Sequence, residues 1–149
     1  DAKKAGADGV LVVDLPPEEA NELKIETDKN SLDLIFLLTP TSDAARIRLV
    51  AEKASGFIYY VSVAGVTGVR KNLASDLKRN MNAIKKNTIL PICVGFGIST
   101  AEQVKKVSSI ADGVVVGSAI VKMIEKNQGR DIAGIIGKFV YELKAAPRS

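Results

Sequence analysis

A glycine-marked turn ends the apolar run in Ile92-Cys93-Val94-Gly95-Phe96-Gly97-Ile98-Ser99, and the pattern recurs in Val114-Val115-Val116-Gly117-Ser118-Ala119. Each turn leads into a helical pattern, and the two lie about one strand-plus-helix unit apart. The start of a helix carries unpaired N–H groups and a partial positive charge, so it favours an anion. Glycine has no Cβ, which lets the backbone amides approach a phosphate closely. A phosphorylated small molecule is therefore the leading candidate ligand.

Short apolar runs alternate with helical periods along the whole chain. The runs are continuous rather than alternating, which is typical of parallel strands that are buried on both faces. This pattern predicts an α/β protein, and two glycine turns after adjacent strands are typical of the last two strands of a phosphate-binding (β/α) barrel. We expect strands over Gly9–Val13, Leu34–Leu38, Phe57–Ser62, Leu90–Gly95 and Gly113–Gly117.

Local signals predict where several helices begin. Pro17 suits a first helical position, and either Ser42 or Asp43 suits the cap of the next helix. The four residues Ser99–Glu102 have the pattern of a capping box. The last helix is expected to turn its apolar face inward through Ile132, Ile135, Ile136, Phe139, Val140 and Leu143.

The strand count is too small for a closed barrel. Five strands are predicted, whereas a (β/α)8 TIM barrel has eight, and an open sheet leaves edge strands unpaired. We therefore expect residues 1–149 to be the C-terminal portion of a single TIM-barrel domain, its last five βα units, with the N-terminal strands and helices absent. A short extra helix from Ser118 to about Glu125 fits this fold. The longer segment Val63–Asn72 is expected to be a mobile active-site loop.

The composition restricts the class of function. With 46% hydrophobic and 26% charged residues, the chain has the composition of a soluble globular domain. It has neither an apolar run of about 20 residues nor a secretory signal, so we expect a cytoplasmic protein that does not enter a membrane. The net charge of +4 comes from lysines mixed with acidic residues. Aromatic residues do not interleave these lysines, which argues against nucleic acid as a partner.

Histidine is absent from the sequence, and cysteine occurs once. Histidine triads and histidine metal sites are therefore excluded, and we expect no metal site of another kind. Cys93 lies inside an apolar run, so a buried packing role is favoured over a nucleophile or a ligand.

Four segments resemble the tryptophan synthase alpha chain family. Residues 7–16, 59–68, 95–99 and 117–122 read ADGVLVVDLP, YYVSVAGVTG, GFGIS and GSAIVK, in the family's order and spacing. The resemblance implies a (β/α)8 barrel and a lyase of tryptophan biosynthesis that cleaves indole-3-glycerol phosphate to indole and glyceraldehyde 3-phosphate without a cofactor. It also implies an α2β2 heterotetramer with the tryptophan synthase beta chain, which joins the indole to serine.

For the residues of this chain, the resemblance implies substrate binding rather than acid–base chemistry. The family's two catalytic carboxylates belong to its second strand and the loop after it, a region that this chain lacks. The residues that correspond to the phosphate site are Gly68, Phe96, Gly97, Gly117 and Ser118.

Further residues correspond to supporting positions. Thr67 matches a loop threonine that closes over the site, and Tyr59 matches a tyrosine near the substrate, with a core aromatic as the alternative. Pro16 and Gly65 match the face that meets the beta chain. Asp14 ends the first predicted strand on the catalytic face of a barrel, where a carboxylate can act as a base. Helix capping or loop bracing is the preferred interpretation for Asp14.

Two other functions remain open at this point. Another phosphate-binding barrel enzyme of amino-acid biosynthesis, acting on a sugar phosphate, would share the glycine turns, although the loop Gly65–Gly68 argues against it. A half-barrel that serves as a binding or assembly module without chemistry of its own would fit the missing carboxylates. In either case we expect this chain to be inactive by itself.

Overall fold

Five parallel strands form one sheet whose order follows the chain. The structure is a computed structural model that describes residues 1–62, 71–95 and 97–145, with the backbone alone for residues 71–74. Neighbouring strands pair throughout in the order β1 (Gly9–Leu11), β2 (Asp33–Leu38), β3 (Ile58–Val61), β4 (Ile92–Gly95) and β5 (Gly113–Val115). The α/β fold of consecutive βα units that the sequence predicts is confirmed.

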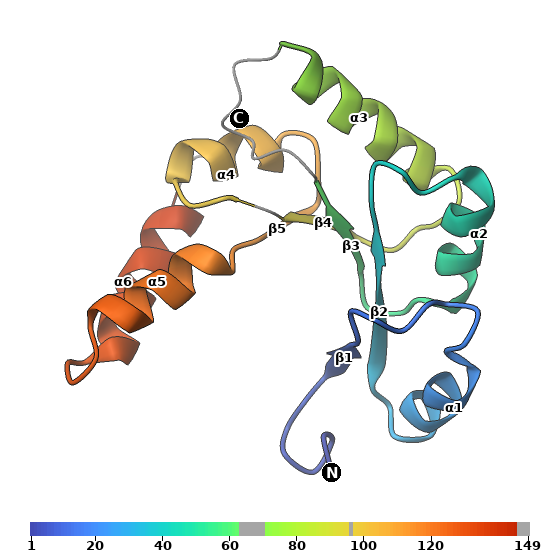
Figure 1. Ribbon diagram of the computed structural model, residues 1–149, viewed down its shortest axis with the longest axis horizontal. Helices are drawn as coiled ribbons and strands as arrows, with labels where there is room; N and C mark the ends of the chain where they lie inside the picture. Colours follow the sequence, from blue (N-terminus) through green and yellow to red (C-terminus); the bar gives the residue numbers. More distant parts are fainter. Residues whose placement is uncertain (63–70, 96, 146–149) are drawn as a thin grey trace.

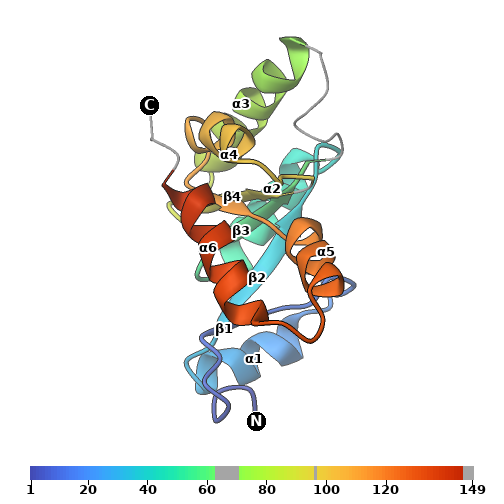
Figure 2. The same ribbon diagram turned by 90° about the vertical axis from the view of Figure 1, so that its left-hand side faces the viewer.

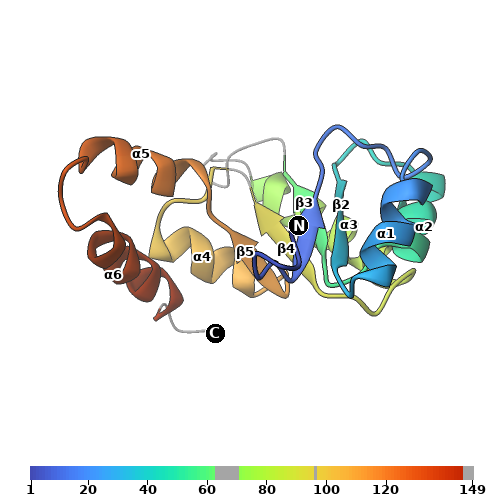
Figure 3. The ribbon, with the colours of Figure 1, turned by 90° about the horizontal axis from the view of Figure 1, so that it is seen from below.

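The helices follow the strands in alternation. They are α1 (Asn21–Lys29), α2 (Ala44–Lys53), α3 (Lys71–Lys85), α4 (Ala101–Ser108), α5 (Ser118–Lys126) and α6 (Ile132–Lys144). Helices α1–α4 lie along the outside of a curved row of strands (Figure 1), while α5 and α6 lie side by side (Figure 2). Seen from below, α1–α3 occupy one end of the sheet and α4–α6 the other (Figure 3). None of the helices in the described ranges is long and apolar enough to cross a membrane.

The main core lies between the strands and the outer helices. Alternate strand residues face these helices and are almost completely buried, and the hydroxyl of Tyr60 accepts a hydrogen bond of 2.7 Å from Nδ2 of Asn80 on α3. Burial of these side chains is the main stabilising contribution to the fold. The core consists chiefly of Leu34, Phe36, Leu38, Val50, Ile58, Tyr60, Met81, Ile84, Ile92, Val94 and Val107.

The opposite face of the sheet is less covered. Leu37, Tyr59, Val61, Cys93 and Val115 alternate with the core residues along β2–β5 and are only half-buried. Figure 1 shows α1–α4 on the other side of these strands. The continuous apolar runs are explained by this arrangement, because both faces of each strand carry apolar side chains.

Four of the five strands are shorter than the sequence predicts, whereas β2 begins one residue earlier, at Asp33. β1 ends at Leu11 rather than Val13, because it pairs with β2 only from Gly9 opposite Asp33 to Leu11 opposite Ile35. From Phe36 onward β2 pairs with β3. The end of β1 is therefore set by its pairing with β2, and apolar content alone does not indicate that point.

The predicted helix starts are partly confirmed. Asp43 caps α2, and its Oδ1 accepts a hydrogen bond of 2.8 Å from the Arg46 amide. The start at Pro17 is wrong, because a turn over residues 17–20 precedes α1, which begins at Asn21. In a helix the Pro17 carbonyl would accept from the Asn21 amide. Here it accepts from Nζ of Lys53 on α2 instead.

The apolar face of α6 is less buried than predicted. Helix α6 contains all six predicted apolar positions and is capped by Asp131, but of these positions only Leu143 is buried and Val140 is 42% exposed. This helix packs against α4 and α5. Its predicted inward face therefore contacts neighbouring helices in part and solvent in part.

Asp112 joins the amino ends of β4 and β5 to α3. Its carboxylate accepts hydrogen bonds of 2.9 Å from the Ile92 amide and 2.9 Å from Nζ of Lys85. Partial burial raises the pKa of Asp112, but the bonds from Ile92 and Lys85 outweigh that effect and hold its pKa below the ordinary value. The charged form of Asp112 therefore stabilises the fold.

We expect Asp112→Ala to lower the free energy of unfolding near pH 7 by about 1 kcal/mol, since the Ile92 amide loses its acceptor and the ion pair is partly exposed. Because the pKa of Asp112 is lower in the folded state, its contribution is complete above the unfolded pKa of about 4 and is lost as the pH falls through the folded pKa. Urea unfolding at about pH 7 and pH 2 measures the difference between wild type and variant. The control Asp28→Ala removes an exposed pair with Lys24 within α1 and should cost less than about 0.5 kcal/mol. A difference for Asp112→Ala that is equally large at both pH values would contradict the assignment.

Candidate functional site

The carboxyl ends of β3, β4 and β5 lie side by side. Parallel pairing places Val61 opposite Gly95 and Gly95 opposite Val115. The segments that leave these three strands therefore start side by side at the carboxyl-end edge of the sheet, formed by the carboxyl ends of its strands. In open and closed parallel sheets this edge is where ligands bind.

The turn after β4 contains Gly97, whose φ of 71° lies in the left-handed region. A residue with a Cβ adopts this conformation at a cost, so glycine fits the position. The chain then enters α4, whose cap is Thr100. Phe96, predicted to lie beside the phosphate, is outside the described residues.

The capping box of α4 lies one residue later than the sequence predicts. It is formed by Thr100 and Gln103 rather than by Ser99 and Glu102, and Glu102 instead forms an ion pair of 2.7 Å with Lys106. Oε1 of Gln103 accepts from the Ser99 amide at 2.7 Å and from the Thr100 amide at 3.1 Å. Gln103 is buried and braces the turn that follows Gly97. The sequence interpretation missed this role because glutamine and glutamate both satisfy the box pattern.

The turn after β5 leads into a helix start whose backbone amides are accessible. Gly117 is the cap residue of α5, and no side chain among the described residues caps this helix start. The Gly117 carbonyl accepts from the amides of Ile120 and Val121 at 2.9 and 3.1 Å. The first-turn amides of a helix have no acceptor within it, so those of Ser118 and Ala119 are available to a ligand. Among the described residues, no heavy atom would lie within 4 Å of a Cβ built at Gly117.

Tyr59 lies at the same edge. A Cβ built at Gly95 would come within 2.6 Å of the Tyr59 hydroxyl and 2.7 Å of its Cε2 atom, and within 2.9 Å of Cβ of Val115. The ring of Tyr59 thus extends from β3 across β4, over the space that Gly95 leaves free. Burial raises the pKa of Tyr59, so its phenol is a neutral hydrogen-bond donor near pH 7.

The described residues of the site can bind rather than transfer protons. Backbone amides after Gly117, the Ser118 hydroxyl and the Tyr59 phenol provide donors for an anion and for polar groups beside it. Gly97, Gly117, Ser118 and Tyr59 are brought to neighbouring strand ends, as the sequence predicts. Their contact with phosphate stays a prediction. Gly65, Thr67 and Gly68 lie outside the described residues.

The remaining candidates lie elsewhere. Pro16 follows β1, at the far end of the sheet from β5, and is half-buried. Asp14 is exposed and does not cap α1, whose cap residue is Ala20, so helix capping is wrong for Asp14 and loop bracing stays a prediction. Cys93 packs against Gly113, and burial together with the nearby Asp112 raises the pKa of its thiol, as suits a packing role. Within the described ranges, no group of three His, Cys, Asp or Glu residues is placed to hold a metal ion.

Several known proteins are similar to this chain in sequence and in fold. The family described as tryptophan synthase alpha chain matches residues 1–145. The tryptophan synthase alpha chain of Geobacter sp. (strain M21) is 58% identical over 144 residues, which cover 97% of this chain and 54% of that protein. The chain spans about half the length of the curated relatives it matches.

Two solved structures extend the comparison. The crystal structure of tryptophan synthase subunit alpha from Legionella pneumophila str. Paris has a TM-score of 0.82 and 36% identity, over 97% of this chain and 53% of that one. A structure of the tryptophan synthase α2β2 complex from Pyrococcus furiosus has a TM-score of 0.79 and 35% identity, over 96% of this chain and 57% of that one.

The fold and the site together define an α/β protein of the (β/α)8-barrel class, with consecutive βα units and glycine turns at the carboxyl edge of its strands. The chain belongs to the tryptophan synthase alpha chain family.

The close fit between Gly95 and Tyr59 can be tested by Gly95→Ala. Because the added methyl group overlaps both the Tyr59 ring and Val115, we expect the free energy of unfolding to fall by about 1–3 kcal/mol. The control Gly137→Ala adds the same methyl group on α6, where a Cβ meets no described atom within 4 Å, and should be neutral or slightly stabilising. Urea unfolding of both variants measures the effect, and equal stability of the two would contradict the packing of Tyr59 over Gly95.

Proposed function

We propose that this chain is the C-terminal portion of an alpha chain that cleaves indole-3-glycerol phosphate to indole and glyceraldehyde 3-phosphate, a lyase reaction of tryptophan biosynthesis. The observation that carries the proposal is the uncapped start of α5 at Gly117, next to the Gly97 turn on the neighbouring strand. Family membership gives the identity of the phosphorylated substrate.

The chain would supply the last five βα units of one TIM-barrel domain. Three features support this organisation: the strands are all parallel, they pair in chain order, and their inner face is only half-buried. The chain also spans about half the length of its relatives. The remaining strands would pair with the free edges of β1 and β5 and close the barrel.

The phosphate would lie between the two glycine turns. The amides of Ser118 and Ala119 would donate to its oxygens, with the partial positive charge of α5 adding to the attraction. Gly97 would let the neighbouring turn approach the same anion, and Gly68 and Phe96 would complete the site. Thr67 would belong to the loop that closes over it.

This chain would bind and orient the substrate, whereas the acid and base belong to the other part of the barrel. Cleavage of the carbon–carbon bond requires protonation of the indole ring carbon and removal of a proton from the glycerol hydroxyl. The neutral phenol of Tyr59 would contact the substrate beside these groups. Since the phosphate is fixed at the β4 and β5 ends, the reacting carbon is held at a set distance from it.

The proposed partner is the tryptophan synthase beta chain. Support comes from the similarity to the alpha chain of the α2β2 complex from Pyrococcus furiosus. Pro16, which is half-buried in the turn after β1, and Gly65 are the candidate contacts with that partner. The cytoplasm is the proposed location.

The activity is tested with the complete alpha chain and indole-3-glycerol phosphate. We expect indole to be released by the complete chain and not by the 149-residue chain alone. The measurement is colorimetric or chromatographic detection of indole. If the complete chain with its beta chain releases no indole, the proposed function is contradicted. If the 149-residue chain alone releases indole steadily, the proposal that the acid and base lie outside this chain is contradicted.

The phosphate site is tested by Gly117→Ala. The methyl group would enter open space at the start of α5, so folding should be unaffected while the space for a phosphate oxygen is reduced. We expect the KM for indole-3-glycerol phosphate to rise about tenfold, which corresponds to about 1.4 kcal/mol of binding. The control Gly137→Ala should leave KM unchanged. An unchanged KM for Gly117→Ala would contradict the proposal that the start of α5 binds the phosphate.

A further inference from the structure

The segment between β1 and α1 has little backbone pairing of its own. Among the described residues, its amides donate two backbone hydrogen bonds, from Leu15 to the Val12 carbonyl at 3.4 Å and from Glu19 to the Pro16 carbonyl at 3.0 Å. Pro16 and Pro17 have no N–H group to donate. The position of this segment, residues 15–20, therefore depends on contacts from other elements. We call it the Pro16 turn.

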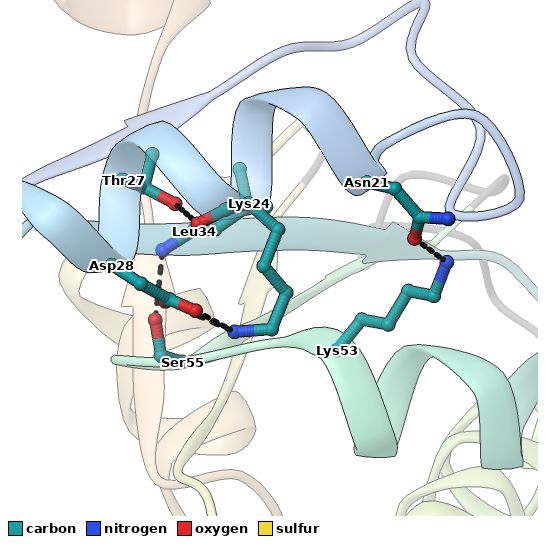
Figure 4. A network of polar contacts seen from close by, with 7 residues as sticks. All are labelled: Asn21, Lys24, Thr27, Asp28, Leu34, Lys53 and Ser55. Atoms are coloured by element: carbon teal, nitrogen blue, oxygen red, sulfur yellow. Dashed lines mark hydrogen bonds and ion pairs between the residues drawn. The ribbon is translucent and has the colours of Figure 1, made fainter.

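Helix α2 supplies these contacts through two cationic side chains. Nζ of Lys53 donates to the Pro17 carbonyl at 2.7 Å and to Oδ1 of Asn21 at 2.7 Å. Nη1 of Arg46 donates to Oε2 of Glu18 at 2.7 Å. Figure 4 shows Lys53 extending from α2 to Asn21 at the start of α1.

The spacing on α2 makes this double contact possible. Arg46 and Lys53 are seven residues apart, which places them on one face of the helix about two turns from each other. The two side chains therefore contact the Pro16 turn at two points, Glu18 through its carboxylate and Pro17 through its carbonyl. Two separated contacts restrict the rotation of the turn as well as its distance from α2.

Helix α2 is itself fixed to the sheet. Val50 is completely buried between them. Directly after the helix, the Ser55 amide donates to the Leu34 carbonyl at 3.0 Å, and the Leu34 amide donates to Oγ of Ser55 at 2.8 Å. These bonds hold α2 against β2 (Figure 4), so Arg46 and Lys53 act from a rigid support.

The Pro16 turn has one buried and one accessible side. Pro17 and Ala20 are buried, Pro16 is half-buried, and Glu18 and Glu19 are exposed. Holding Pro17 from inside therefore sets the direction in which Pro16 and Glu19 face outward.

We propose that Lys53 and Arg46 are positioning residues for partner binding: they hold the Pro16 turn in the shape that the beta chain recognises. The inference rests on the proposed function, in which Pro16 contacts that chain. Neither residue needs to touch the partner, because a turn that samples other shapes lowers the fraction of chains competent to bind and weakens the apparent affinity by that fraction.

The two residues differ in expected effect. Lys53 makes two hydrogen bonds, one of them to the partly buried carbonyl of Pro17, which would accept from the Asn21 amide in a helix. Arg46 and Glu18 form an exposed ion pair, with side chains 37% and 53% exposed, and such pairs contribute little. We expect Lys53→Met to raise the Kd for the beta chain about tenfold and Arg46→Leu about twofold.

The experiment titrates the complete alpha chain with the beta chain of its own tryptophan synthase by isothermal titration calorimetry. The variants are Lys53→Met, Lys53→Arg, Arg46→Leu and the control Lys29→Met, which removes an equal charge from an exposed pair with Glu26 on α1. Lys53→Arg keeps the charge and the donors, so it should restore the Kd to within about twofold of wild type. The control should bind as wild type does.

The outcomes separate the inference from the function on which it rests. Wild-type affinity in both Lys53→Met and Arg46→Leu would overturn the positioning role and leave the proposed function standing. Failure of Lys53→Arg to restore the affinity would also overturn it, because loss of side-chain packing would then explain the effect. If Lys53→Met does not fold, the Kd of Arg46→Leu alone tests the positioning role, and wild-type affinity in that variant would overturn it. No binding by the unmodified complete chain would overturn the proposed partner and this inference, whereas the proposed lyase activity is tested separately by indole release.

Discussion

Parallel in-register pairing of β3, β4 and β5 brings Val61, Gly95 and Val115 to one edge of the sheet. This pairing places Ile58 beside Ile92 and Tyr60 beside Val94, and all four side chains are buried against α3 and its neighbours. A shift of one residue in either pairing would turn this apolar row away from the helices. The register is therefore fixed by the core, and the register in turn fixes which residues meet at the carboxyl ends of the strands.

The features of the candidate site follow from this register. Gly95 lies where the ring of Tyr59 needs space, and a larger residue in its place would displace the phenol from the edge. The turns at Gly97 and Gly117 leave neighbouring strands at the same level, and at the second turn α5 begins with no cap from the side chains that the structure describes. At the other edge of the sheet, Asp112 holds the amino ends of β4 and β5 together. The amino-end edge thus contributes stability and the carboxyl-end edge contributes binding groups, as is usual in barrels.

Local signals in the sequence predicted much of this structure. Apolar runs between turn residues identified all five strands, and the periodic apolar residues of α6 identified that helix. The glycine turns after β4 and β5 were predicted to neighbour each other because consecutive strands in such folds pair in order. These signals depend on residues within a few positions of each other, which is why a single sequence reveals them.

The features that the sequence did not predict depend on distant contacts. The cap of α4 lies at Thr100 because Gln103 folds back while Glu102 pairs with Lys106, a choice between two similar local patterns. Helix α1 starts at Asn21 rather than at Pro17, whose carbonyl accepts a hydrogen bond from Lys53, a residue far along the chain. Tyr59 and Gly95 fit together only through the register of two strands. Helix α6 kept a half-exposed apolar face because its partners are α4 and α5.

The most direct test of the account is a crystal structure of the complete alpha chain with sn-glycerol 3-phosphate bound. The account predicts the phosphate within hydrogen-bond distance of the Ser118 and Ala119 amides, beside the turn that contains Gly97. A phosphate held instead by surface lysines, with the start of α5 unoccupied, would contradict it.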